Sequence, residues 1–235
     1  MTALAASFAA VHERLAAACR NVGRSPDAVA LLAVSKRHPA EAVREALALG
    51  QRDFGENRVQ ELVQKSRELA DVSPAQLRWH LIGSLQTNKV RDLLAVPGLA
   101  VVQSLDRLRL ADELQRECAR LGRSLDVLLQ VNATGEQQKH GCAVADAPAL
   151  LAHVQATCPA LRVDGLMAMG PLDGDPRPVF DEVVALQGRL RSASGLPLST
   201  TSIGMSDDLE VAVAAGSTMV RIGTALFGER QPFGD

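Results

Sequence analysis

Aromatic residues are scarce in this chain of 235 residues, and tyrosine is absent altogether. Aromatic side chains make up 3% of the sequence, so the platforms on which single-stranded nucleic acids stack their bases are not expected. The formal net charge is −2, and no segment gathers the basic residues of a nucleic-acid-binding face. The composition therefore argues against nucleic-acid recognition.

Cysteines and long apolar runs are also few. The N-terminal segment lacks the basic start of a signal peptide, and no apolar run approaches the length of a membrane span. We therefore expect a cytoplasmic protein with no membrane partner. The cysteines form no CxxC pair, which argues against a metal site or a disulfide framework; they are Cys19, Cys118, Cys142 and Cys158.

Lysine is the rarer of the two basic residue types. Arginine stays protonated, so any chemistry that needs an amine nucleophile is confined to the lysines. There are four of them: Lys36, Lys65, Lys89 and Lys139. Lys36 ends the apolar run VALLAVSK at 29–36, whereas Lys65 and Lys89 are expected on helix surfaces and Lys139 in a loop.

Short apolar segments alternate with longer amphipathic ones along the chain. Most of the short segments lack polar alternation, which is typical of parallel strands buried on both faces. No GxGxxG sequence follows the first of them, which argues against a dinucleotide-binding open sheet. The pattern predicts an α/β fold, a single-domain (β/α)8 TIM barrel over residues 1–235 with an extra N-terminal helix. The expected strands are 29–36, 52–57, 78–85, 99–104, 125–132, 163–170, 198–205 and 218–223.

Active sites of such barrels lie at the carboxyl ends of the strands. This rule brings four polar side chains to one rim: Lys36, Asn57, His80 and Arg221. Arg221 stands among apolar residues, so its burial requires a partner, either a structural ion pair or a ligand. His80 is either a hydrogen-bonded core residue or part of a pocket, and no second residue stands at metal-ligand spacing from it.

The loops after the seventh and eighth expected strands are rich in small residues. Gly204 in SIGMS permits close backbone approach, and a helix expected from Asp207 would leave its first N–H groups unpaired. Gly223 and Thr224 in RIGT form a second small turn. Barrels commonly bind phosphate with these two loops. An ordinary helix start at a tight corner is the alternative, and the adjacent acidic residues weaken the phosphate interpretation.

Four segments, in order along the chain, resemble one family. LLAVSK at 31–36, FGENRVQE at 54–61, WHLIGSLQTNK at 79–89 and SIGMSDDLEVAVAAGSTMVRIGTALFG at 202–228 are similar to the pyridoxal phosphate homeostasis proteins. These are single-domain relatives of the N-terminal barrel of alanine racemase. The resemblance covers nearly the whole chain. Arg58, Ser84 and Ile203 depart from the common pattern, where tyrosine, proline and methionine are frequent.

The resemblance implies a barrel that binds pyridoxal 5′-phosphate (PLP). Lys36 would form a Schiff base with the cofactor aldehyde, and Arg221 would face the pyridine nitrogen. Asn57 and His80 would line the cofactor pocket. The phosphate would be held by Ser202, Gly204, Met205, Gly223 and Thr224.

The implied role is PLP (vitamin B6) homeostasis: holding PLP and buffering or delivering it, with apo-forms of PLP-dependent enzymes as recipients. Robust turnover is not expected, because arginine donates to an unprotonated ring nitrogen and leaves the ring a poorer electron sink than aspartate would. The racemase pattern also uses a tyrosine base, which this chain lacks. A low-activity amino-acid racemase is the alternative, and a PLP-independent Schiff-base aldolase is a third possibility. We expect a monomer, with Lys139 as a candidate second PLP contact.

Overall fold

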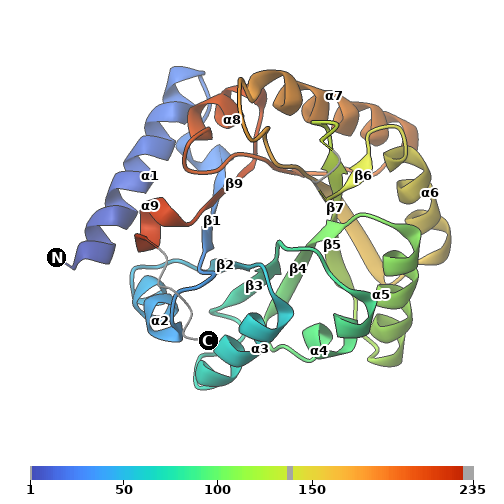
Figure 1. Cartoon of the computed structure of the whole chain (residues 1–235), viewed down its shortest axis with the longest axis horizontal. Coiled ribbons are helices and arrows are strands. Elements are labelled where there is room, and N and C mark those ends of the chain that lie inside the picture. The colour runs from blue at the N-terminus through green and yellow to red at the C-terminus, as the bar shows by residue number, and fades with distance from the viewer. Residues whose placement is uncertain (1, 137–139, 230–235) are drawn as a thin grey trace.

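The computed structural model describes residues 2–136 and 140–229. Within them, eight parallel strands form a ring in the order β4-β3-β2-β1-β9-β8-β7-β5, and β4 pairs with β5 to close it. The predicted TIM barrel is confirmed (Figure 1). The ring consists of β1 (Ala30–Val34), β2 (Asp53–Glu56), β3 (Arg78–Leu81), β4 (Leu99–Leu105), β5 (Leu125–Asn132), β7 (Leu161–Met167), β8 (Thr200–Ser202) and β9 (Met219–Ile222).

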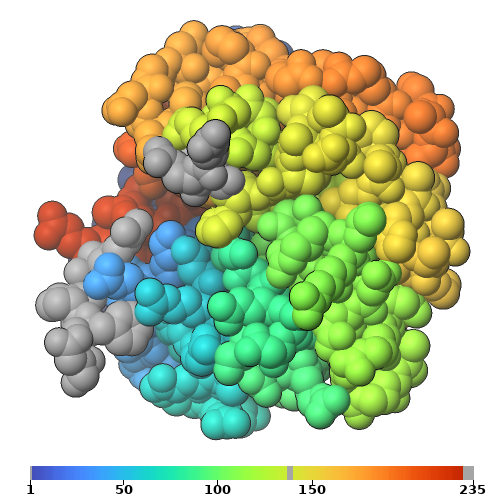
Figure 2. Space-filling view, turned by 45° about the vertical axis from the view of Figure 1, so that its right-hand side comes forward, coloured from blue at the N-terminus to red at the C-terminus, as the bar shows by residue number. Residues whose placement is uncertain are grey.

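Helices surround the strands (Figure 1), and segments that follow one another in the chain also follow one another around the molecule, as the colours of Figure 2 show. The predicted extra N-terminal helix is present and packs against α8 and α9. Two short 3₁₀ turns, Pro26–Ala28 and Thr87–Lys89, precede β1 and α4. The helices are α1 (Ala3–Asn21), α2 (Ala40–Ala48), α3 (Val59–Glu68), α4 (Val90–Leu94), α5 (Leu108–Arg120), α6 (Ala147–Thr157), α7 (Arg177–Ser194), α8 (Leu209–Ala215) and α9 (Thr224–Phe227).

Most strands differ from their predicted bounds by one to four residues, and there are two larger departures from the prediction. The strand predicted over 198–205 is reduced to β8, three residues long, because Leu198 and Gly204 both have left-handed φ angles that interrupt an extended chain. A two-residue strand, β6 (Cys142–Ala143), extends the sheet beside the end of β5 and was not predicted. So short a segment carries no periodicity from which it could be recognised.

The apolar core lies mainly between the strands and the surrounding helices, where Phe54, Trp79 and Phe180 are fully buried. A second, separate apolar cluster is small and consists of Val101, Leu128 and Met167. Buried polar side chains from β3, β4, β8 and β9 contact one another and complete the barrel interior. No helix in the described part of the chain has the length and apolarity needed to cross a membrane.

Helix α1 also braces a loop at the carboxyl end of the barrel. Arg14 makes two hydrogen bonds of 2.6 Å to the carboxylate of Glu210 in α8, and it donates to the carbonyl oxygen of Ser206 at 2.7 Å. Paired bonds between a guanidinium and a carboxylate fix orientation as well as distance. The N-terminal helix thereby fixes the start of α8, next to the rim where the site is expected.

Candidate functional site

A pocket of about 630 Å³ opens where the carboxyl ends of the strands meet. Its wall comes from the ends of β1, β2, β3, β5, β7 and β9 and from the loop after β8. The barrel rule thus brings together residues that are far apart in the sequence. Six of the nine predicted site residues line this pocket: Lys36, Asn57, Met205, Arg221, Gly223 and Thr224.

The other three predicted residues, His80, Ser202 and Gly204, lie beneath the pocket wall rather than on it. Gly204 has a φ of +96°, and a Cβ there would come 2.4 Å from the Cβ of Ala212 in α8. This glycine therefore serves the packing of α8 against the barrel. Lys139 lies outside the described residues.

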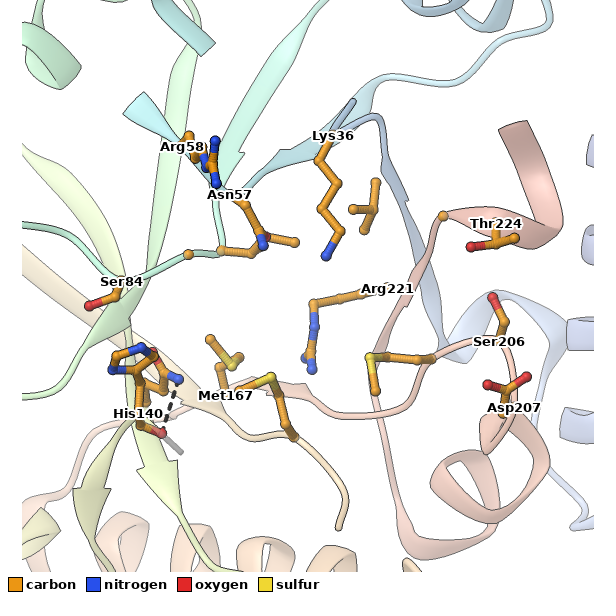
Figure 3. Close-up of a pocket in the computed structure, with 17 residues that line it drawn as sticks. Lys36, Asn57, Arg58, Ser84, His140, Met167, Ser206, Asp207, Arg221 and Thr224 are labelled. Atoms are coloured by element: carbon orange, nitrogen blue, oxygen red, sulfur yellow. Dashed lines mark hydrogen bonds between the residues drawn. The ribbon is translucent and has the colours of Figure 1, made fainter. Parts of the chain in front are cut away.

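Lys36 is half-buried and follows Ser35, the residue after the end of β1. Its side chain extends into the pocket, and the side chain of Arg221 extends into the same pocket from the neighbouring strand β9 (Figure 3). The Lys36 amine and the Arg221 guanidinium therefore both reach into one pocket from adjacent strands.

The turn that carries Lys36 is anchored on both sides by a buried ionic cluster. The ammonium of Lys65, which is 4% exposed, donates to the carbonyl oxygen of Ser35 at 2.6 Å. On the other side of Lys36, the backbone N–H of Arg37 donates to the Glu61 carboxylate at 2.5 Å, and Arg37 has a left-handed φ of 65°. Lys65 was expected on a helix surface, and this expectation was wrong because helical spacing does not reveal a buried acidic partner.

Glu56, at the end of β2, completes this cluster. Its Oε1 accepts hydrogen bonds from Lys65 at 2.6 Å and from the hydroxyl of Ser35 at 2.7 Å, while its Oε2 is buried without a partner among the described residues. Burial raises the pKa of Glu56 to about 7; Lys65 opposes this and the negative charge of Glu61 adds to it. Burial therefore favours the protonated form of Glu56.

Arg221 is 5% exposed and is held by three uncharged oxygens. It donates to the carbonyl oxygen of Ser202 at 2.5 Å, to the Ser202 hydroxyl at 2.8 Å and to the carbonyl oxygen of Ala168 at 2.8 Å. Burial lowers its pKa to about 10, against a smaller opposing influence of Asp208, so it remains protonated at neutral pH. Arginine has five N–H donors, so three bonds leave donors for a molecule in the pocket.

The loop after β8 forms the wall beside Thr224 (Figure 3). Helix α8 begins at Leu209, two residues later than predicted, and the carboxylate of Asp208 accepts a hydrogen bond from the backbone N–H of Met205 at 2.5 Å. The backbone N–H groups of Ser206 and Asp207 donate to no other described residue. Hydroxyl and N–H donors thus gather at this end of the pocket, together with the exposed carboxylate of Asp207.

Asn57 is placed on the opposite wall by a close backbone contact. A Cβ on Gly83 would lie 2.0 Å from the carbonyl oxygen of Asn57, so only glycine allows the chain after β3 to approach the end of β2 so closely. The neighbouring Arg58 and Ser84, two of the positions that depart from the common family pattern, also line the pocket.

Comparison with known proteins first identifies the class of barrel to which this chain belongs. Residues 8–231 match the family of the alanine racemase N-terminal domain. Full-length alanine racemases share only the fold: the enzyme of Corynebacterium glutamicum has a TM-score of 0.66 at 15% identity, and the match covers 96% of this chain and 62% of that one.

Much more similar relatives lie within that class. The pyridoxal phosphate homeostasis protein of Pseudomonas aeruginosa is 46% identical, with coverage of 98% of this chain and 97% of the relative; that of Escherichia coli K12 is 43% identical, with 98% of both chains covered. PipY of Synechococcus elongatus PCC7942, solved with PLP bound, is 40% identical with a TM-score of 0.79, over 93% of this chain and 100% of that one. The chain belongs to the pyridoxal phosphate homeostasis protein family.

Proposed function

We propose that this chain binds PLP in the pocket between Lys36 and Arg221 and acts in intracellular PLP homeostasis, holding the cofactor and buffering or delivering it. The observation that carries the proposal is that the amine of Lys36 and the buried guanidinium of Arg221 reach into one pocket. The PLP bound by the similar PipY supports it.

The residues of the pocket fit the chemical groups of PLP. Lys36 is the amine for the aldehyde: its nitrogen adds to the aldehyde carbon, and one water leaves as the Schiff base forms. Water reverses this reaction without any oxidant or reductant, which suits a protein that returns its ligand. Arg221 has donors for the ring nitrogen, and Ser206, Gly223 and Thr224 offer hydroxyl and backbone donors for the phosphate.

The same residues argue against efficient catalysis. When bound, PLP supplies an electron sink, but the protonated Arg221 keeps the ring nitrogen as an acceptor and so weakens that sink. A racemase also needs a second base. His80 is already engaged beneath the pocket, and burial, together with the charges of Asp106 and Asp146, raises the pKa of Cys142 to about 11, so this thiol stays protonated.

A low-activity racemase is the second candidate, and the imidazole of His140 favours it. His140 lines the same pocket as Lys36, and histidine is the side chain that most often acts as a general acid or base. Turnover of single L-amino acids well above that of free PLP, lost in His140→Ala, would establish this activity.

We propose a monomer made of one barrel domain, which sedimentation of the purified chain tests directly.

Protection and transfer of the cofactor test the homeostasis role. Alkaline phosphatase destroys free PLP, so the protein loaded with PLP should slow this loss and then restore activity to an apo-form of a PLP-dependent enzyme. Lys36→Ala should abolish the protection. Lys89→Ala is the matched control, because Lys89 lies in the turn before α4 and only pairs with Asp92 at 3.7 Å. Equal protection by Lys36→Ala and the unchanged protein would contradict the proposal.

A further inference from the structure

A continuous line of hydrogen bonds crosses the barrel interior beneath the pocket. Arg221 Nη1 donates to Ser202 Oγ at 2.8 Å, and Ser202 Oγ donates to Gln103 Oε1 at 2.8 Å. Gln103 Nε2 contacts His80 Nδ1 at 2.9 Å, and His80 Nε2 contacts Asp53 Oδ1 at 3.0 Å. The line connects five strands, β9, β8, β4, β3 and β2, and ends at the amino-terminal side of the barrel.

With a neutral His80, the chemistry of the partners fixes the direction of every bond. The ionised carboxylate of Asp53 only accepts, so the proton of His80 sits on Nε2 and Nδ1 is an acceptor. The amide nitrogen of Gln103 then donates to His80, and its oxygen accepts the Ser202 hydroxyl. The oxygen of Ser202 in turn accepts from Arg221, which has only donors. All four bonds therefore point the same way, from a cation to an anion.

The aligned hydrogen bonds lie in the buried interior of the barrel, where each bond has a larger effect on its neighbours than it would in water. Gln103 and Ser202 are fully buried, and His80 is 1% exposed. Hydrogen bonds in such surroundings polarise one another along a chain, whereas a single unpaired member is costly. Burial alone would raise the pKa of Asp53, but contact with His80 and the charge of Arg78 outweigh it and lower that pKa, so the anionic end persists.

We propose that Asp53, His80 and Gln103 are positioning residues that orient Arg221, through Ser202, for its contact with the ring nitrogen of the bound ligand. The inference rests on the proposed PLP site. It gives His80 a role that differs from the predicted one: this residue acts on the pocket through other side chains and does not line it. Without the line, the guanidinium keeps the carbonyl oxygens of Ser202 and Ala168, but the Ser202 hydroxyl that also accepts from Nη1 loses its own acceptor and is no longer held in orientation.

Breaking the line in the middle is the most direct test. Gln103→Met removes both hydrogen bonds at the centre while keeping an unbranched side chain. Gln187→Met is the matched control: Gln187 is 3% exposed, accepts from Thr201 at 2.6 Å and donates to the carbonyl oxygen of Leu198 without reaching Arg221. Both variants should lose stability toward urea. Only Gln103→Met should weaken PLP binding, by about tenfold, and shift the visible absorption of the bound cofactor.

A ligand without an aldehyde separates this inference from the Schiff base. Pyridoxine 5′-phosphate has the ring and the phosphate but cannot react with Lys36, and Gln103→Met should weaken its binding by a similar factor. If the unchanged protein binds it but takes up no PLP covalently, the Schiff base fails and the line is still tested. If it binds neither compound, both proposals are overturned.

Two further measurements test the proposal even if Gln103→Met does not fold. Nitrogen NMR of the unchanged protein should show His80 as the neutral imidazole protonated at Nε2, with the Nδ1 signal moving when pyridoxine 5′-phosphate is added. Asp53→Asn, whose side chain is 26% exposed, should fold and weaken binding several-fold. Unaltered binding in both Asp53→Asn and Gln103→Met, or an Nδ1 signal indifferent to the ligand, would overturn the proposal.

Discussion

Replacing Glu56 by glutamine should change the pH dependence of the stability of the unliganded protein. Glutamine has nearly the shape of protonated glutamate and keeps an oxygen for Lys65 and Ser35. It removes the possibility of a buried negative charge on the carboxyl group, whose Oε2 has no partner among the described residues. The substitution therefore compares a group that can ionise inside the protein with one that cannot.

The size of the effect follows from the pKa of Glu56, which rises from 4.5 in the exposed state to about 7 in the folded protein. Between these values the folded state holds a proton that the unfolded chain has released, so the free energy of unfolding falls as pH rises through this range. At 1.36 kcal/mol per pKa unit, the fall is about 3 kcal/mol in total, and most of it lies between pH 5 and pH 8. Glu56→Gln should lack this fall.

Urea denaturation of both proteins at pH 5 and pH 8 measures the difference. Relative to the unchanged protein, Glu56→Gln should gain about 2–3 kcal/mol between the two pH values. The exposed Glu45 on α2 provides the control, because Glu45→Gln should show no such gain. If Glu56→Gln instead becomes relatively less stable at pH 8, then the ion pair with Lys65 outweighs burial and our account of the cluster is wrong.

Three further predictions concern the loops around the pocket. Gly204→Ala should lower the free energy of unfolding, measured with urea, by about 2–4 kcal/mol, because its Cβ would meet Ala212 at 2.4 Å and its φ is left-handed. The control is Gly174→Ala, where φ is +94° but the space is open, and it should lower the free energy of unfolding by only about 1–2 kcal/mol. Asp207→Asn should bind PLP several-fold more tightly in a spectroscopic titration, since it removes a carboxylate that repels phosphate; unchanged affinity would place the phosphate elsewhere. Arg14→Met should weaken PLP binding several-fold by releasing Ser206, whereas Arg20→Met should not.

Much of the fold was predictable because its signals are local. Runs such as 30–34 are apolar on both faces, and strands buried between a filled barrel and its helices need that composition. The position of Lys36 was predictable for the same reason, since the end of a barrel strand has a known location. What the sequence does not encode locally is which way a side chain near a strand end points.

His80 and Lys65 show where such reasoning stops. Helical spacing placed Lys65 on a surface, yet its ammonium lies between Glu56 and Glu61, and only the tertiary structure brings these acids to it. His80 was expected at the pocket wall, but the middle of a short strand puts it below, where Gln103 and Asp53 hold it. The burial of both residues depends on partners that lie at least four residues away in the chain, and most of these partners lie much farther away.

The most direct test of the central claim is to locate the covalently held cofactor. The protein should be loaded with PLP, reduced with borohydride and digested, and the modified peptide identified by mass spectrometry. Our account predicts one predominant modification, on Lys36, with the visible absorption of the loaded protein absent in Lys36→Ala. Predominant modification of another lysine, or the same absorption in Lys36→Ala, would contradict it, and trapping that requires a sugar phosphate would point to an aldolase.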